Sequence, residues 1–263
     1  KIHEMSLIKG RKPESVRCRR ERCNFRANEF ISVTESLLMW DQLKEVHNMK
    51  NDHVLNQVMH KFTNSIDRSF VIAAGHSFGG GTALASASKR PDLYKAVVAH
   101  DAAADWMPDF ARRDLMRPEK LIKSGCEYDG GEGGWSTPAK IENPQNEKKK
   151  SDITIQDDTN LYGKNVTDKS SLHDLPLQFQ WSRDWLNKGW AISKQIKKMH
   201  EADVLGCKNS DVCVVTEQHS EFSDVCMLTP LWLARSTGLT GPRNPIETAR
   251  EVAKRSIEFL NKL

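Results

Sequence analysis

Residues 75–79 read Gly-His-Ser-Phe-Gly, a pattern that can hold a serine in a sharp turn between a strand and a helix. A serine hydroxyl is a weak nucleophile at neutral pH, so such a turn must present its oxygen to a base. The flanking glycines remove side chains that would clash in so tight a bend. We therefore expect Ser77 to attack an acyl carbonyl. The amide of Phe78 is expected to donate a hydrogen bond to the oxyanion that forms.

The base should follow the serine in the chain, after an acid that orients it. Of the nine histidines, only His173, His200 and His219 follow the first plausible acid. His200 ends a lysine-rich helical segment and His173 borders a loop-rich stretch, whereas His219 comes three residues after an apolar strand segment. His219 is therefore the expected base.

Two aspartates are candidates for the orienting acid. Asp101 ends the strand that follows the nucleophile helix, and Asp184 follows the next strand. Ligands of open α/β sheets bind outside the carboxyl ends of the strands, where both aspartates would lie. Position in the sequence alone leaves the choice open. Either triad would work through an acyl-enzyme and requires neither a metal ion nor a cofactor.

The elements that position these residues alternate between strands and helices. Continuous apolar runs predict buried strands, and apolar residues at three- and four-residue steps predict helices. The expected strands cover residues 70–74, 95–101, 175–181 and 211–216, and the expected helices cover 27–46, 52–62, 79–89, 187–201 and 244–263. Residues before about 24 look charged and irregular, and the two helices before the first strand are expected to pack on the sheet. The sequence therefore predicts an α/β fold with a mostly parallel sheet and helices on both faces.

The length of 263 residues favours one large domain over two small ones. Apolar periodicity disappears over residues 112–172, where glycine-rich and Asn-Pro segments predict a long loop-rich insertion. Loops of such length often cover a site or border a cleft. The prediction is one domain over residues 1–263 with an insertion at about 112–172.

Composition excludes several classes of protein. The formal net charge is only +4, from 39 basic and 35 acidic residues that are interspersed, which does not favour nucleic-acid binding. Hydrophobic residues make up 38% of the chain, and no run approaches the length of a transmembrane segment. The six cysteines show no metal-binding spacing and leave the compartment open between cytoplasm and secretion, with a slight preference for the cytoplasm.

Several motifs together resemble the platelet-activating factor acetylhydrolases, the group VII phospholipases A2. They are Ser-Ile-Asp-Arg at 65–68, Gly-His-Ser-Phe-Gly-Gly at 75–80, His-Asp-Ala at 100–102, Trp-Met at 106–107, Leu-Pro-Leu-Gln-Phe at 175–179 and His-Ser-Glu-Phe-Ser-Asp at 219–224. The resemblance implies an α/β-hydrolase fold and calcium-independent hydrolysis of the sn-2 ester of phospholipids with short or oxidised acyl chains. It also implies Asp101 rather than Asp184 as the acid.

Two other functions stay open at this point. One is a general carboxylesterase or lipase of the same fold, and the other is a catalytically inactive binding protein that keeps the serine turn as scaffold. The expected partners are a phospholipid or another acyl ester, with transient contact to a membrane or lipoprotein surface. Four tryptophans near predicted strand ends could line an acyl pocket: Trp106, Trp181, Trp185 and Trp232.

The start of the chain departs from the family pattern. Hydrolase sheets of this type normally have strands before the nucleophile strand, and the loop after one of them supplies the second oxyanion donor. In the family this loop follows a His-Gly segment, which does not occur before Gly75. We expect the chain to be the carboxyl-terminal portion of a longer enzyme, with a half-built oxyanion hole, an exposed strand edge and weak activity.

Overall fold

The computed structural model describes residues 13–40, 66–116, 171–188, 190–206 and 209–263. The helix expected over 52–62 and most of the insertion expected at 112–172 lie outside the described residues. The organisation as one domain with that insertion therefore stays a prediction. Among the described helices, none is long and apolar enough to cross a membrane.

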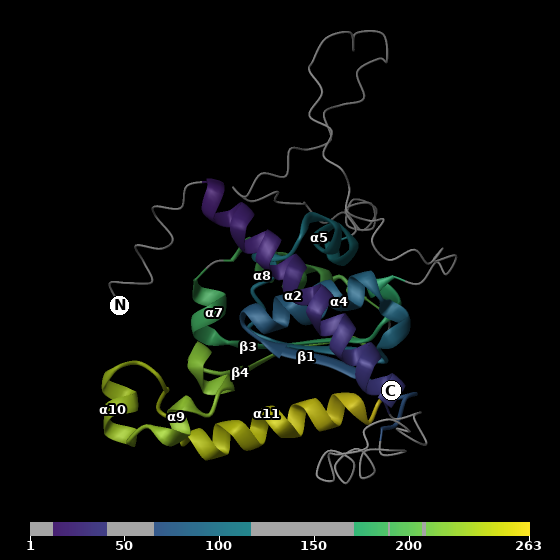
Figure 1. The fold of residues 1–263 in the computed structure, drawn as a ribbon. Coiled ribbons are helices and arrows are strands. Elements are labelled where there is room, and N and C mark those ends of the chain that lie inside the picture. Colours follow the sequence, from purple (N-terminus) through teal and green to yellow (C-terminus); the bar gives the residue numbers. More distant parts are fainter. Residues whose placement is uncertain (1–12, 41–65, 117–170, 189, 207–208) are drawn as a thin grey trace, which may run out of the picture.

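A four-stranded parallel sheet forms the centre of the described structure (Figure 1). Its strands lie side by side in chain order: β1 (Ile72–His76), β2 (Ala96–His100), β3 (Leu177–Ser182) and β4 (Asp211–Thr216). All four strands were expected, and the boundaries of β4 agree with the sequence. The α/β fold class is confirmed. Within the described residues β1 pairs on one side only, with β2.

The first strand begins two residues later than the sequence predicted. The amide of Phe70 donates to the carbonyl of Asp67 at 3.1 Å, and the Asp67 carboxylate accepts from the amide and hydroxyl of Ser69. These bonds close a turn that includes Phe70, the residue expected to begin the strand. The strand instead runs on through Gly75 to His76 and delivers Ser77 directly at its end.

Small side chains let helix α4 (Phe78–Lys89) pack closely on β1 and β2. A Cβ atom on Gly80 would lie 2.9 Å from the Cβ of Ala102 and 3.1 Å from the carbonyl oxygen of Gly75. Glycine is therefore required there, because any side chain would push the helix away from the turn. The expected helix over 79–89 is confirmed, with its first residue at Phe78.

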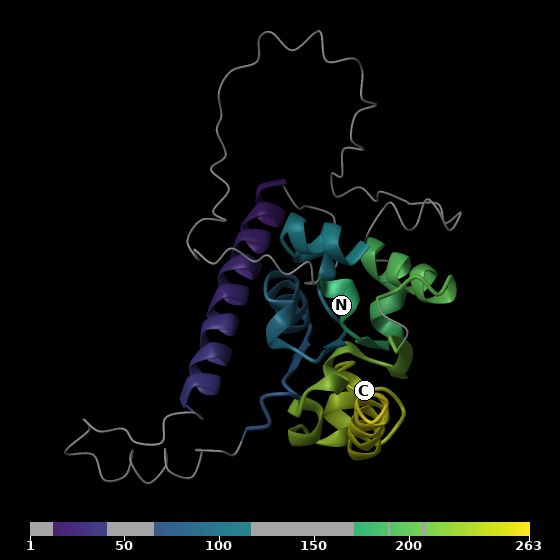
Figure 2. The ribbon, with the colours of Figure 1, turned by 90° about the vertical axis from the view of Figure 1, so that its right-hand side faces the viewer.

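Helix α2 (Pro13–Trp40) forms a further layer outside α4, as Figure 2 shows in side view. Cys23 and Ala27 are fully buried in this contact, and the Ser86 hydroxyl donates to the Ala27 carbonyl. Two predictions were wrong here. Residues 13–24 are helical rather than irregular, and α2 packs on α4 rather than on the sheet. The helix does not stand out in the sequence, because its buried face is made of small residues such as Cys23 and Ala27 instead of large apolar ones. On its exposed side Arg17 and Glu21 form an ion pair one turn apart.

The opposite face of the sheet is covered by helix α11 (Pro245–Leu260). Phe259 of this helix packs against Ala96 and Val98 of β2. The Asn244 side chain caps its first turn by accepting from the Ile246 amide at 2.9 Å. The other α-helices of the described residues are α5 (Asp109–Met116), α7 (Arg183–Asn187), α8 (Ala191–Glu201), α9 (Val225–Leu228) and α10 (Leu231–Ser236).

Candidate active site

Ser77 occupies a strained backbone conformation between β1 and α4, with φ 56° and ψ −120°. Non-glycine residues rarely adopt positive φ, and such strain persists only where neighbours enforce it. Here the Ser77 amide donates to the His100 carbonyl at 2.9 Å, and the Ser77 carbonyl accepts from the Ala103 amide at 2.8 Å. A Cβ on Gly75 would lie 2.3 Å from the carbonyl oxygen of Gly79, so the bend also requires glycine there.

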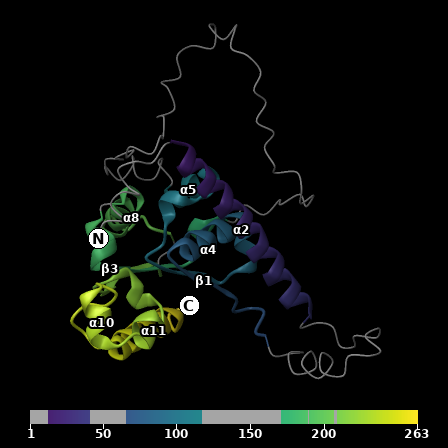
Figure 3. The same cartoon turned by 60° about the vertical axis from the view of Figure 1, so that its left-hand side comes forward.

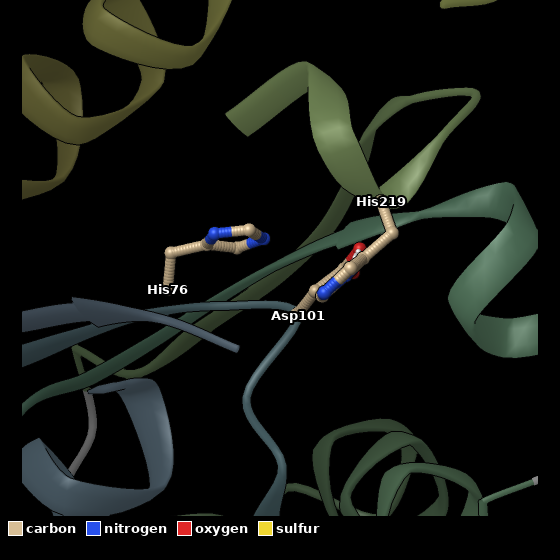
Figure 4. Close-up of side chains that lie close together, drawn as sticks. All are labelled: His76, Asp101 and His219. Atoms are coloured by element: carbon tan, nitrogen blue, oxygen red, sulfur yellow. Dashed lines mark hydrogen bonds and ion pairs between the residues drawn. The ribbon is translucent and has the colours of Figure 1, made fainter. Parts of the chain in front are cut away.

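A chain of hydrogen bonds joins Ser77, His219 and Asp101. The distance between Ser77 Oγ and His219 Nε2 is 3.0 Å, and that between His219 Nδ1 and Asp101 Oδ2 is 2.9 Å. A carboxylate can only accept, so Nδ1 carries the hydrogen and Nε2 is left to accept from the serine. Figure 4 shows the imidazole of His219 lying against the Asp101 carboxylate.

Asp101 is completely buried and follows β2 with a φ of 41°. The Ser182 amide donates to Oδ1 at 2.7 Å, and the Ser182 hydroxyl donates to Oδ2 through a short hydrogen bond. Ser182 also caps α7 by accepting from the Trp185 amide at 3.1 Å. Ser182 was not among the residues expected from the sequence. Its place at the end of the strand next to Asp101, as a serine before a helix, is the signal that could have indicated it.

Asp184 lies elsewhere. Its carboxylate pairs with Lys188 at 2.9 Å, one turn along α7, and its amide donates to the Glu217 carbonyl at 3.0 Å. The hydrogen bond from His219 goes to Asp101 and not to this aspartate.

A buried carboxylate fixes the loop that carries His219. Glu221 is 4% exposed and lies in the short 3₁₀ helix His219–Phe222. Its oxygens accept from the amides of Glu217 and Gln218 at 2.8 and 2.9 Å, and from the Thr240 hydroxyl and Gly241 amide at 2.7 and 2.9 Å. These four donors satisfy the charge and tie the loop after β4 to the segment before α11. This second residue was also missed by the sequence analysis.

Aromatic rings enclose the imidazole of His219. Trp185 stacks on it with a centroid distance of 4.5 Å and an interplanar angle of 14°, and the His76 ring lies 4.5 Å away, tilted by 40°. Phe222 in turn contacts His76 and His100.

Two of these neighbouring rings are uncharged near neutral pH. Burial lowers the pKa of His76 to about 4, with a smaller contribution from the charge of His219, and burial lowers the pKa of His100 to about 4. Neither ring therefore opposes a positive charge on His219 at neutral pH.

His76, Asp101 and His219 also offer ligand atoms within 4.8 Å of one another, as a metal site would (Figure 4). Nδ1 of His219 and Oδ2 of Asp101 are already joined by a hydrogen bond, so a cation bound by those atoms would have to displace the proton between them. The arrangement as it stands is that of a proton relay.

Phe78 is the first residue of α4, where a helix leaves its first amides without intrahelical acceptors. Its amide thus belongs to a helix N-terminus, which favours a developing negative charge. Of the four tryptophans considered for an acyl pocket, Trp106 lines a cavity with Phe78 and Trp185 contacts His219. Trp181 is buried in the core, and Trp232 is 72% exposed on α10.

Comparison with known proteins agrees with this geometry. Residues 2–119 match the family model described as platelet-activating factor acetylhydrolase, isoform II. The matched residues make up less than half of the chain, so the match is a similarity to that family over its first part. The chain is also 37% identical over 78 residues to the cutinase Est2 of Thermobifida alba. The matched stretch covers 30% of this chain and 24% of the cutinase, so the chain spans about a quarter of that relative's length.

Proposed function

We propose that this protein is a serine hydrolase that cleaves the sn-2 acyl ester of phospholipids that carry short or oxidised acyl chains, without calcium. The observation that carries the proposal is the continuous hydrogen-bond chain from Ser77 through His219 to the buried Asp101. The family match over residues 2–119 supports the choice of substrate class.

In the first half of the reaction, the Ser77 oxygen attacks the ester carbonyl while Nε2 of His219 takes the serine proton. Asp101 accepts the hydrogen bond from Nδ1 and stabilises the imidazolium. The Phe78 amide donates to the oxyanion of the tetrahedral intermediate. As the intermediate collapses, the ester C–O bond breaks and His219 gives its proton to the leaving alcohol.

In the second half, water attacks the acyl-enzyme. Nε2 of His219 takes one proton from the water and returns it to Ser77 as the serine–acyl bond breaks. The products are the free carboxylic acid and the regenerated serine.

Contact with a lipid surface belongs to the same proposal. Helices α9 and α10 expose six large apolar side chains within nine residues, beginning six residues after His219: Val225, Met227, Leu228, Leu231, Trp232 and Leu233. Exposed patches of this kind mark interaction sites, and tryptophan favours the boundary between water and lipid.

The similarity to a cutinase favours a second candidate, a broader carboxylesterase or lipase of the same fold. A substrate panel separates the two. We expect a higher kcat/KM for a phospholipid with an sn-2 acetyl group than for a simple acetate ester or a triglyceride. The reverse order would favour the broader esterase.

Labelling with a fluorophosphonate probe tests whether the site is catalytic at all. We expect wild-type protein to be labelled at Ser77 and Ser77→Ala to lose both labelling and turnover, the latter by several orders of magnitude. A folded wild-type protein that the probe does not label would instead support an inactive binding protein.

A further inference from the structure

A cavity of about 800 Å³ opens beside the nucleophile turn, between α2 and the residues that follow β1 and β2. Figure 3 shows α2 crossing above α4 in this region. The lining combines three guanidinium groups with three aromatic rings: Arg19, Arg22, Arg26, Phe25, Phe78 and Trp106.

The arginines follow one another at three- and four-residue steps, so they share one face of α2. The Arg19 guanidinium lies 4.1 Å from the centroid of the Trp106 ring, and Arg22 is exposed. Neither forms an ion pair with an acid in the described part of the chain. Arg26 is bound to Glu29 at 2.7 Å.

The acid within the lining does not neutralise this charge. Glu21 pairs at 2.9 Å with Arg17, which is outside the cavity. Arg19 and Arg22 thus have no acidic partner among the described residues. They lie next to the rings of Phe25, Phe78 and Trp106, which together we call the aromatic floor of the cavity.

The aromatic floor includes Phe78, which directly follows the nucleophile Ser77 in the chain. Phe78 lines the cavity with its side chain, and its backbone belongs to the turn that carries Ser77. A series of ring contacts then continues from Phe78 to Trp106 at 6.3 Å, to Trp190 at 5.5 Å, to Trp185 at 5.0 Å and to His219 at 4.5 Å. A substrate whose ester carbonyl lies at Ser77 can therefore extend past Phe78 into the cavity.

We propose that Arg19 and Arg22 bind an anionic group of the ester substrate, a proposal that rests on the proposed hydrolase function. Guanidinium groups bind carboxylates and phosphates through paired hydrogen bonds. The aromatic floor packs against the aliphatic part of the substrate. The anion is a carboxylate at the end of the acyl chain or a phosphate on the alcohol.

Two matched pairs of esters test this subsite and distinguish the two sources of charge. The acyl pair is 4-nitrophenyl pentanoate and the 4-nitrophenyl monoester of glutaric acid. The alcohol pair is diacetylglycerol and diacetylglycerol 3-phosphate. We expect the wild type to prefer the anionic member of one pair, and that preference to fall about tenfold in Arg19→Gln and in Arg22→Gln through a higher KM. The kcat/KM of the neutral member should stay within about twofold of the wild-type value.

Arg250→Gln is the control, because Arg250 is exposed on α11 and does not line the cavity. It should keep the preference. Increasing salt should weaken the preference of the wild type, since the cavity is open to solvent. Hydrolysis without preference in either pair, or an equal loss of preference in Arg250→Gln, would overturn the proposal.

A binding measurement keeps this result separate from the fate of the proposed function. Saturation-transfer NMR with Ser77→Ala protein would detect binding of glutarate or glycerol 3-phosphate without turnover. Binding that disappears when Arg19→Gln is added supports the subsite even if wild-type protein hydrolyses none of the four esters, an outcome that would refute the hydrolase function alone. No binding of either anion, or binding unchanged by Arg19→Gln, overturns the subsite.

Discussion

At the scale of single residues, the surroundings of Asp101 differ from those of an ordinary surface acid. Three donors converge on its two oxygens: the imidazole of His219, and the amide and hydroxyl of Ser182. Because the carboxylate is fully buried, these donors replace water as its source of stabilisation. They also fix the direction in which it faces the imidazole.

Replacing each candidate acid by asparagine tests this assignment. We expect Asp101→Asn to lower kcat by about 10⁴-fold, because an amide can donate to the ring and hold the wrong tautomer. Asp184→Asn should remain close to wild type, because its carboxylate pairs with Lys188 and not with His219. Steady-state kinetics on a soluble ester would measure both, and the opposite order of effects would assign the acid to Asp184.

The lowered pKa of His100 predicts that the folded protein loses stability in weak acid. Its pKa is lowered from 6.5 to about 4 by burial, so the unfolded chain binds its proton more readily than the folded protein. The contribution of His100 to stability is therefore complete above pH 6.5 and is lost as the pH falls towards 4.

The variant His100→Phe keeps a ring against Phe222 but cannot titrate. The difference in melting temperature between pH 7 and pH 5 should be smaller in this variant than in the wild type. His200→Gln, at a half-exposed position on α8, serves as the control. An unchanged difference in His100→Phe would show that the ring does not contribute to the acid sensitivity.

At the scale of elements, two glycines of α4 have opposite surroundings. Gly80 faces Ala102 and the turn, whereas a Cβ on Gly79 would meet no atom within 4 Å. Gly80→Ala should destabilise the protein by about 1–3 kcal/mol, because α4 would have to move off the sheet. Gly79→Ala should be neutral or stabilise the protein by up to about 1 kcal/mol through helix propensity. Urea unfolding of both variants measures the difference, and equal effects would contradict the close packing.

The elements that were predictable from the sequence are those whose local pattern agrees with their burial. β4 and α11 combine apolar periodicity with clear ends, and both were found at or within three residues of the expected bounds. The amino-terminal half of α2 was not predictable, because the small residues that it buries do not stand out from its charged neighbours. Packing against α4, a tertiary contact, determines that segment.

The candidate site also has residues that were predictable from the sequence and residues that were not. Ser77, Asp101 and His219 follow strands whose apolar runs are visible in the sequence, so their meeting at one edge of the sheet was predictable. Ser182 and Glu221 act through hydrogen bonds to residues 81 and up to 20 positions away. A serine before a helix indicates the cap of α7, but the bond from Ser182 to Asp101 depends on the pairing of β2 with β3, and no local pattern indicates the partners of Glu221. The second oxyanion donor expected from a preceding strand stays a prediction: the described part of residues 1–69 contains α2 and no strand, and residues 1–12 and 41–65 lie outside it.

At the scale of the whole molecule, the apolar segment 225–233 lies close in sequence to the loop that carries His219. Leu228 and Trp232 are 80% and 72% exposed, which is unfavourable in water and favourable at a lipid surface.

We expect Trp232→Ser to weaken binding to phosphatidylcholine vesicles in a flotation assay, while hydrolysis of a soluble ester stays unchanged. Ile257→Ser, at an exposed apolar position on α11, should leave vesicle binding intact. Equal vesicle binding by wild type and Trp232→Ser would remove this segment as the contact.

The order of the strands has a consequence for when the protein becomes reactive. Ser77 follows the first strand of the sheet and His219 follows the last, with 142 positions between them. During synthesis Ser77 therefore emerges long before His219 exists. Under the proposed function, we expect Ser77 to stay unreactive toward esters until β4 has joined the sheet and His219 is in place. A fluorophosphonate probe added to stalled nascent chains of increasing length should label none that end before β4 and His219 have left the ribosome.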